Sequence, residues 1–191
     1  MNTIDINRIG IFSGSFDPPH KGHIHISKIF LRKLKLKKLI WSVTKKNPLF
    51  KKKYYYTFKE RVVLSKKISN NIKKINVSNY DKKYSYQLIN FIKNKYKNSQ
   101  IFFLVGSDSI KDFHKWKKFL HIINVCTLVV INRPGYYDTF KNSTFFKNYG
   151  KFMKKDFKNL NIIPKKVWFY ISDKGKKISS SSIKNRLYKN K

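Results

Sequence analysis

The sequence predicts an α/β fold of the Rossmann-like, doubly wound class, with a mostly parallel sheet and helices on both of its faces. Short apolar runs recur along the chain and alternate with longer segments of helical periodicity. The runs lack polar alternation, which is typical of strands buried on both faces. Strands that alternate with helices indicate a parallel sheet, in which ligands bind at the carboxyl ends of the strands.

The first three elements have clear boundary signals. Residues 8–13 form an apolar run that ends at Gly14, as expected of a buried strand. Residues 22–34 carry apolar side chains at helical spacing after two prolines that mark the start of a helix. Residues 39–43 are again strand-like.

The next three elements repeat the alternation. A helix is predicted over 57–68, because Thr57 and Glu60 have the spacing of a capping box. A short strand is predicted over 75–77 and a helix over 85–95.

The second half of the chain contains three further strands. An apolar run at 101–105 ends in a glycine, and helical pieces follow between 109 and 120. The remaining predicted elements are two strands and a terminal helix, over 125–131, 167–171 and 180–188. The aromatic, basic stretch 136–161 lacks clean periodicity, and we expect it to form a variable subdomain or lid of a single domain spanning 1–191.

Composition excludes several classes of protein. The chain has 191 residues with 16 Phe, 12 Tyr and 3 Trp, so it can bury a core and is not of the disordered class. With 7 Gly and 5 Pro it is not collagen-like, and a single cysteine, Cys126, excludes a disulfide scaffold. No apolar run approaches the roughly 18 residues of a membrane span, and the N-terminus does not resemble a signal peptide. We therefore expect a cytoplasmic protein.

The formal charge of +35, from 44 Lys+Arg against 9 Asp+Glu, allows two interpretations. Lysine excess is the electrostatic footprint of nucleic-acid binding. However, the lysines are spread from Lys21 to Lys191, arginine is scarce, alanine is absent and Glu60 is the only glutamate. We favour the hypothesis of an AT-rich genome and expect only weak, nonspecific adsorption to nucleic acid at low salt.

The richest motif, GSFDPPHKGH, occupies residues 14–23 between the first strand and the first helix. A glycine turn followed by a helix N-terminus can bind an anion through backbone N–H groups. His20 and His23 are three residues apart, so both imidazoles can face the same phosphate. A tight turn with two incidental histidines is the alternative. Zinc needs further ligands, for which Asp17 is the only nearby carboxylate, and the motifs of serine hydrolases and P-loops are absent.

This motif resembles the signature of the HxGH nucleotidyltransferase superfamily, whose members transfer a nucleotidyl group from ATP or CTP. The second superfamily signature, ISSTxIR, is matched in part by residues 178–184 at the start of the terminal helix. Ser181 replaces the threonine and Lys184 replaces the arginine. Lysine keeps a cation at this position but loses the planar, bidentate fork of arginine.

Features between the two motifs resemble those of one subfamily, the bacterial nicotinate-mononucleotide adenylyltransferases. The second proline of DPPH is one such feature. The others are GSDS at 106–109, FHKW at 113–116 and NRPGY at 132–136. The pieces Lys46-Asn47-Pro48, Glu60-Arg61 and Tyr84-Ser85-Tyr86 also fall in the family's order.

The resemblance implies that AMP is transferred from ATP to nicotinate mononucleotide, giving nicotinate adenine dinucleotide and pyrophosphate. It implies that His20, His23 and Lys184 are catalytic. The ATP-binding residues would be Gly14, Ser15, Phe16, His20, Gly22, His23, Asp108, Arg133, Ser180, Ser181 and Lys184. The residues that bind the mononucleotide would be Lys46, Asn47, Lys51, Ser85, Tyr86 and Trp116. Mg²⁺ would arrive with ATP rather than in a protein metal site. No membrane or specific nucleic-acid partner is implied, and the oligomeric state stays open.

Several alternatives stay open at this point. Trp116 could be a core residue, Asp108 a helix N-cap, Arg133 a cap of the sheet, and the serines at 179–182 a flexible stretch. Residues 54–56 and His121 are interpreted as surface or packing residues. The enzyme could instead transfer AMP to phosphopantetheine or FMN, or CMP to a phospho-alcohol. An inactive relative or a basic RNA-binding module is a further alternative.

Overall fold

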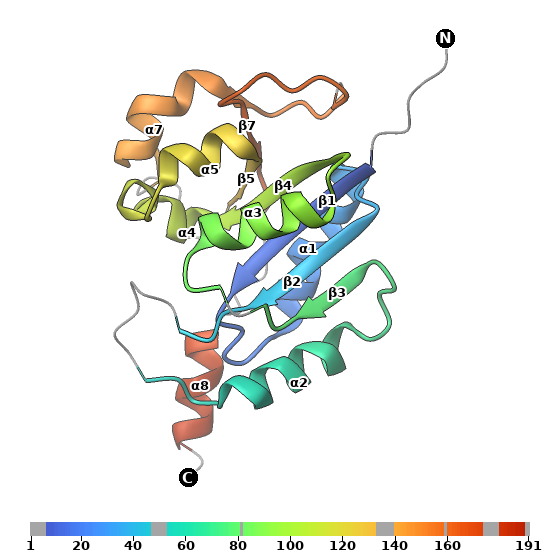
Figure 1. Ribbon diagram of the computed structural model, residues 1–191. Helices are drawn as coiled ribbons and strands as arrows, with labels where there is room; N and C mark the ends of the chain where they lie inside the picture. The colour runs from blue at the N-terminus through green and yellow to red at the C-terminus, as the bar shows by residue number, and fades with distance from the viewer. Residues whose placement is uncertain are drawn as a thin grey trace.

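One seven-stranded sheet organises the molecule (Figure 1). The computed structural model describes residues 7–46, 53–80, 82–132, 140–158, 160–173 and 180–189, and within the last range only the side chains of 180 and 182–185. The strands are β1 (Asn7–Gly14), β2 (Lys38–Val43), β3 (Ile75–Ser78), β4 (Ser99–Gly106), β5 (Thr127–Ile131), β6 (Met153–Lys154) and β7 (Trp168–Ile171).

Helices connect these strands. The α-helices are α1 (Lys21–Lys33), α2 (Phe58–Ser69), α3 (Ser85–Lys95), α4 (Ser107–Ile110), α5 (Phe119–Val125), α7 (Thr144–Tyr149) and α8 (Ser180–Lys189). Two 3₁₀ turns, η1 (Phe113–Lys115) and η2 (Gly150–Phe152), accompany them. Among the described residues no helix is both long enough and apolar enough to cross a membrane.

The strand order is β3-β2-β1-β4-β5-β7-β6, and every pairing between these strands is parallel. From β1 the chain winds outward through β2 and β3, then returns to place β4 on the other side of β1. The point between β1 and β4 is therefore a topological switch point, where parallel sheets form ligand-binding crevices. This order confirms the predicted Rossmann-like fold class.

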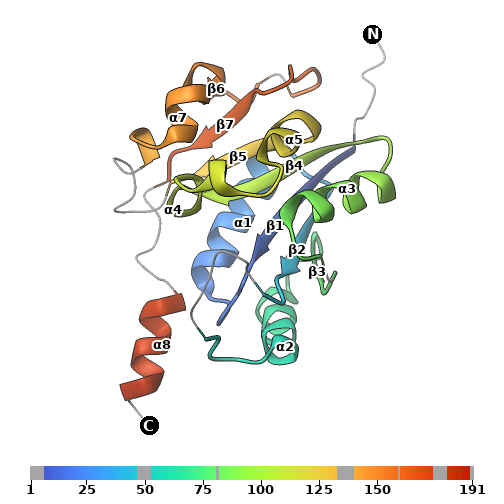
Figure 2. The ribbon, with the colours of Figure 1, turned by 60° about the vertical axis from the view of Figure 1, so that its left-hand side comes forward.

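The sheet is covered on both faces, as Figure 2 shows. In β4, Phe103 and Val105 face a core that contains residues of α3, α5 and α7, whereas Phe102 and Leu104 face a core against α1 and α2. Successive side chains of a strand point to opposite faces, so an apolar run without polar alternation is what two such cores require.

Close packing fixes α1 against the first strand. A Cβ atom on Gly10 would lie 2.5 Å from Leu36 Cδ1 and 2.8 Å from Phe30 Cε1, and both of these side chains are fully buried. Only glycine therefore fits at this position of β1. The contact sets the distance between β1 and the helix that follows the GSFDPPHKGH motif.

All six predicted strands and the predicted helices are present, with two differences. The predicted strand at 125–131 begins too early, because α5 extends to Val125 and Cys126 ends that helix by bonding its N–H to the Ile122 carbonyl. The stretch 136–161 also contains elements that periodicity did not reveal, namely α7, η2 and the edge strand β6. These elements are only two to six residues long, too short for a periodic pattern.

Candidate active site

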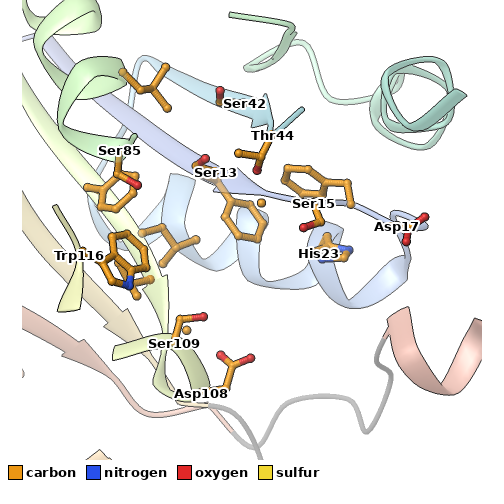
Figure 3. A pocket seen from close by; sticks show the side chains of 18 of the residues that line it. Ser13, Ser15, Asp17, His23, Ser42, Thr44, Ser85, Asp108, Ser109 and Trp116 are labelled. Carbon is orange, nitrogen blue, oxygen red and sulfur yellow. The ribbon is translucent and has the colours of Figure 1, made fainter. Parts of the chain in front are cut away.

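A cavity of about 620 Å³ opens at the carboxyl ends of β1 and β4. This volume is in the range of small-molecule sites. Figure 3 shows Ser85 and Trp116 on one side of the cavity and His23 and Asp17 on the other. Nine of the predicted site residues line it, namely Gly14, Ser15, Phe16, His23, Ser85, Asp108, Trp116, Ser180 and Lys184.

The two histidines of the motif form the N-terminal cap of α1. The N–H of Gly22 donates to His20 Nδ1 at 3.1 Å, and the N–H of His20 donates to His23 Nδ1 at 3.1 Å. An imidazole nitrogen that accepts a hydrogen bond carries no proton, so the proton of each neutral ring is on Nε2. The cap therefore makes each Nε2 a hydrogen-bond donor. Of the two rings only His23 lines the cavity, whereas His20 is 5% exposed and lies behind it.

Aromatic packing holds the His23 ring in place. Phe16 is buried and stacks on Trp41 with ring centroids 4.9 Å apart, and the His23 ring lies 4.9 Å from Phe16. Trp41 is in turn fixed by a 2.8 Å hydrogen bond from its Nε1 to Ser27 Oγ on α1. Phe16 adopts a φ of 46°, a left-handed conformation that directs its side chain into the core.

Asp17 joins three segments at the His23 end of the cavity. Its carboxylate is 3% exposed and accepts hydrogen bonds from the N–H groups of Tyr55 and Tyr56 at 3.0 and 2.9 Å. Lys184 Nζ from α8 lies 3.3 Å from the same carboxylate. A second contact, from Ser180 Oγ to the Pro18 carbonyl at 3.0 Å, also joins α8 to the motif. These contacts place the N-terminal turn of α8 over the loop that follows β1.

Arg61 lies next to this site and is 1% exposed. Its guanidinium donates to the carbonyls of Ser15, Thr44, Lys45 and Tyr56 at 2.6, 2.8, 3.2 and 3.3 Å. Burial lowers the pKa of Arg61, while the nearby Asp17 carboxylate acts in the opposite direction. Arginine stays protonated in proteins, so a buried positive charge lies directly behind the cavity wall.

The other end of the cavity is aromatic and basic. Trp116 is half-buried against Phe113 and Phe103, with centroid distances of 5.2 and 6.2 Å. Ser85, the first residue of α3, and Tyr84, its N-cap, line the cavity. Four lysines surround this end, Lys82, Lys83, Lys115 and Lys117.

Other predicted site residues lie away from the cavity or outside the described residues. Gly22 lies in the first turn of α1, and Lys46 is exposed; neither is a lining residue. Tyr86 is not a lining residue either; its ring lies 6.0 Å from that of Tyr84 and 6.4 Å from that of His121, with Lys118 Nζ 5.1 Å above it. Asn47, Lys51 and Arg133 lie outside the described residues, as does the side chain of Ser181.

Sequence reasoning missed the roles of four residues at this site. Asp17 was considered only as a zinc ligand, although an aspartate inside the richest motif and directly before two prolines is a signal for a structural role. Arg61 forms its contacts with main-chain carbonyls, for which no sequence pattern exists. Tyr84 was named only as part of a motif, and Tyr54, which was interpreted as a surface or packing residue, also lines the cavity.

Within the part of the chain that the structure describes, no group of three His, Cys, Asp or Glu side chains is arranged to hold a metal ion. The helix N-termini of α1 and α8, the His23 ring and Lys184 all meet at one end of the cavity.

Comparisons with known proteins found a family and several relatives of this chain. The family model described as cytidylyltransferase-like matches residues 11–186. A probable nicotinate-nucleotide adenylyltransferase of Pelagibacter ubique is 43% identical over 133 residues, which cover 68% of this chain and 73% of the relative. A protein of the same name from Mesorhizobium japonicum is 32% identical over 182 residues, covering 92% and 93% of the two chains.

A solved structure shares the fold. The nicotinic acid mononucleotide adenylyltransferase of Plasmodium falciparum, complexed with NaAD, superposes with a TM-score of 0.70 at 21% identity. The superposition covers 95% of this chain and 84% of the other.

Proposed function

This chain belongs to the cytidylyltransferase-like family, among the bacterial nicotinate-nucleotide adenylyltransferases, and from that membership we propose that it transfers AMP from ATP to nicotinate mononucleotide. The products are nicotinate adenine dinucleotide and pyrophosphate, so the enzyme acts in NAD biosynthesis. One observation carries the proposal. A single cavity at the β1–β4 switch point combines phosphate-binding groups at one end with a tryptophan at the other.

The reaction needs little acid–base chemistry. The 5′-phosphate of the mononucleotide is already an anion at pH 7, because the second pKa of a phosphate monoester is about 6. One of its oxygens forms a bond to the α-phosphorus of ATP, and the bond from that phosphorus to the bridging oxygen breaks. Pyrophosphate leaves with the electron pair. The protein therefore has to align the two phosphates and stabilise the charge that develops on them.

The His23 end of the cavity supplies that stabilisation. We assign the α- and β-phosphates to the catalytic pair, His20 and His23. The His23 ring lines the cavity and can donate from Nε2, whereas His20 lies behind the cavity wall, so its assignment follows from the family resemblance. The His20 N–H bond to His23 Nδ1 keeps the His23 ring in the donor form. Lys184 is the third catalytic group and brings a cation to the triphosphate from α8. Backbone N–H groups at Ser15 and Phe16, together with Ser180 and Ser181, complete the proposed phosphate site. Mg²⁺ enters as the MgATP substrate.

The Trp116 end accepts the pyridine ring in this proposal. Trp116 offers a flat, half-buried indole for stacking. The N-terminus of α3 at Ser85 provides backbone N–H groups for the pyridine carboxylate. Asp108, which follows β4 on the cavity wall, is assigned to ribose hydroxyls.

The remaining assignments follow from the family resemblance alone. Gly14 and Gly22 allow close approach of the nucleotide, and Arg133 contacts its adenine or a phosphate. Tyr86, Lys46, Asn47 and Lys51 are proposed near the mononucleotide. The segment 136–161 is proposed as a variable part of a single domain, and the cytoplasm as the compartment.

Pyrophosphate release tests the proposed function. The purified protein is incubated with MgATP and, in parallel, nicotinate mononucleotide, nicotinamide mononucleotide or phosphopantetheine. We expect release with nicotinate mononucleotide above the other two. We expect His23→Ala to lower kcat by about 100- to 1,000-fold, the cost of losing one donor to the transition state.

The matched control is His121→Ala, because His121 bonds Asn90 on α3 and is not a lining residue of the cavity. It should keep wild-type activity. Pyrophosphate release with phosphopantetheine as the only active acceptor would agree with the superfamily and refute nicotinate mononucleotide as the acceptor. No release with any acceptor from the folded wild-type protein would refute the proposed function.

A further inference from the structure

The guanidinium of Arg61 is buried at the junction of three loops that surround the phosphate end of the cavity. Ser15 belongs to the loop after β1, Thr44 and Lys45 follow β2, and Tyr56 precedes α2. The carbonyl oxygens of all four residues accept hydrogen bonds from this one side chain, at 2.6 to 3.3 Å. Arg61 thus donates hydrogen bonds to three segments that are not adjacent in sequence.

Two of these acceptors belong to residues that themselves line the cavity, Ser15 and Thr44. A third lining residue, Tyr54, has its ring 4.3 Å from the guanidinium carbon. Moving the guanidinium would therefore move the cavity wall. The planar fork of arginine can satisfy several acceptors in fixed directions, which the single ammonium of lysine cannot do.

Asp17 completes the arrangement from the opposite side. Arg61 accepts no hydrogen bonds and donates to the carbonyls of Ser15 and Tyr56, whereas Asp17 accepts from the N–H groups of Tyr55 and Tyr56. The loop after β1 and the segment before α2 are therefore joined by two buried groups of opposite charge. Asp17 also holds Lys184, so the position of the proposed catalytic lysine depends on the same junction.

We propose that Arg61 is a positioning residue for nucleotidyl transfer: it aligns the phosphate-binding loop at Ser15 with the proposed catalytic groups His23 and Lys184, and its buried charge favours the MgATP polyphosphate. This inference rests on the proposed function for its kinetic readout. It does not require direct contact between Arg61 and the substrate. Because a displacement of about 1 Å can cost about 100-fold in rate, loss of the fork should impair turnover more than stability.

The chain offers a matched control in Arg8. This arginine also joins distant segments through its guanidinium, at 3.2 Å to Gln100 Oε1 and 2.7 Å to Asn161 Oδ1. It is the second residue of β1, at the amino end of the strand, whereas the cavity opens at the carboxyl end. Arg8→Lys therefore removes a guanidinium that joins distant segments without touching the proposed site.

The experiment compares Arg61→Lys, Arg61→Ala, Arg8→Lys and the wild type. Thermal unfolding, kcat and KM for ATP, and the Kd of MgATP by titration calorimetry are measured on each preparation. We expect Arg61→Lys to lose about 100-fold in kcat/KM and Arg8→Lys less than about threefold, at similar melting temperatures. We also expect guanidinium ions at millimolar concentration to raise kcat/KM of Arg61→Ala severalfold without affecting Arg8→Lys.

Two outcomes would overturn the inference. One is a wild-type kcat/KM in Arg61→Lys. The other has two parts. The loss of kcat/KM is proportional to the fall in melting temperature in both Arg61→Lys and Arg8→Lys, and guanidinium ions do not restore the activity of Arg61→Ala. If the wild type itself transfers no AMP, the proposed function fails. The Kd of MgATP then decides the role of Arg61, because a weaker Kd in Arg61→Lys than in Arg8→Lys supports it and equal values refute it.

Discussion

At the scale of single residues, two lysines flank the ring of Tyr84 at the cavity end where Trp116 lies. Lys83 Nζ is 5.4 Å and Lys117 Nζ 4.8 Å from the ring centroid, and both lysines line the cavity. Nicotinate and nicotinamide mononucleotides differ there by one negative charge. An exposed ion pair contributes up to about 1 kcal/mol, so we expect the double variant Lys83→Gln, Lys117→Gln to lower the nicotinate-to-nicotinamide ratio of kcat/KM by about three- to tenfold.

Lys118 provides the control for this prediction. It lies over the ring of Tyr86 at 5.1 Å, in the same kind of contact, but it is not among the lining residues. Lys118→Gln should leave the ratio of the two substrates unchanged. The effect of the double variant should also shrink at high salt, since exposed charges are screened. If the nicotinate-to-nicotinamide ratio of kcat/KM is unchanged in the double variant at low salt, Lys83 and Lys117 do not select nicotinate mononucleotide over nicotinamide mononucleotide.

The residues of the site were predictable to the extent that they belong to contiguous motifs. Gly14, Ser15 and His23 lie in one such motif. Lys184 could be placed with them because residues 178–184 resemble the second signature of the same superfamily. Arg61 could not be placed, because its partners are carbonyls from three loops that only the folded chain brings together. The family resemblance indicated Tyr86, but of these two tyrosines it is Tyr84, the N-cap of α3, that lines the cavity.

At the scale of elements, strong signals came from strands buried on both faces and from helix caps. The capping box at Thr57 and Glu60 was predicted and is confirmed, with Thr57 N–H donating to Glu60 Oε2 at 2.7 Å and Glu60 N–H to Thr57 Oγ1 at 3.3 Å. The elements within 136–161 were not predictable. Their core residues, such as Phe140 and Phe145, contact Trp168 of the distant strand β7, so long-range packing rather than local pattern determines them.

The cap makes a prediction about stability and pH. Thr57→Ala should lower the free energy of unfolding at pH 7 by about 1 kcal/mol, as for other N-caps. Hydrogen bonds from the Thr57 side chain and backbone lower the pKa of Glu60 below its ordinary value of 4.5. A carboxylate with a lowered folded pKa contributes stability above the unfolded pKa and loses it as pH falls through the folded pKa.

The difference between wild type and Thr57→Ala should therefore be constant from pH 7 to about pH 5 and narrow below about pH 4.5. Urea denaturation across this range measures it. Glu60→Gln, which keeps an acceptor for the Thr57 N–H but carries no charge, should show no such narrowing when it is compared with its own Thr57→Ala double variant. A difference that is constant down to acidic pH would contradict the assignment of the cap to an ionised Glu60.

At the scale of the whole molecule, positively charged residues occur at both ends of the sheet, near the amino ends and near the carboxyl ends of its strands. The last turns of α1, α2 and α3 are basic, with Arg32, Lys33, Lys66, Lys67, Lys93 and Lys95. Crossover helices run antiparallel to the strands, so these turns lie at the edge opposite the cavity, where they also interact favourably with the helix dipoles. Lys83, Lys117 and Lys184 lie at the cavity edge. The basic residues named here are therefore divided between the two ends of the strands.

An RNA titration distinguishes an enzyme with a basic surface from an RNA-binding module. We expect an unstructured RNA of about 20 nucleotides to bind at about 50 mM KCl and to lose about 1,000-fold or more in affinity at about 200 mM, because counterion release dominates nonspecific binding. Pyrophosphate release should persist at the higher salt, since its phosphate contacts are few and partly buried. Fluorescence anisotropy with two RNAs of unrelated sequence, run beside the activity assay, measures both. If the two RNAs bind with equal affinity at about 50 mM KCl and both lose that affinity at about 200 mM, the binding is nonspecific adsorption. A Kd below about 1 µM at 200 mM KCl, or a preference for one sequence, would instead assign the lysines to RNA recognition.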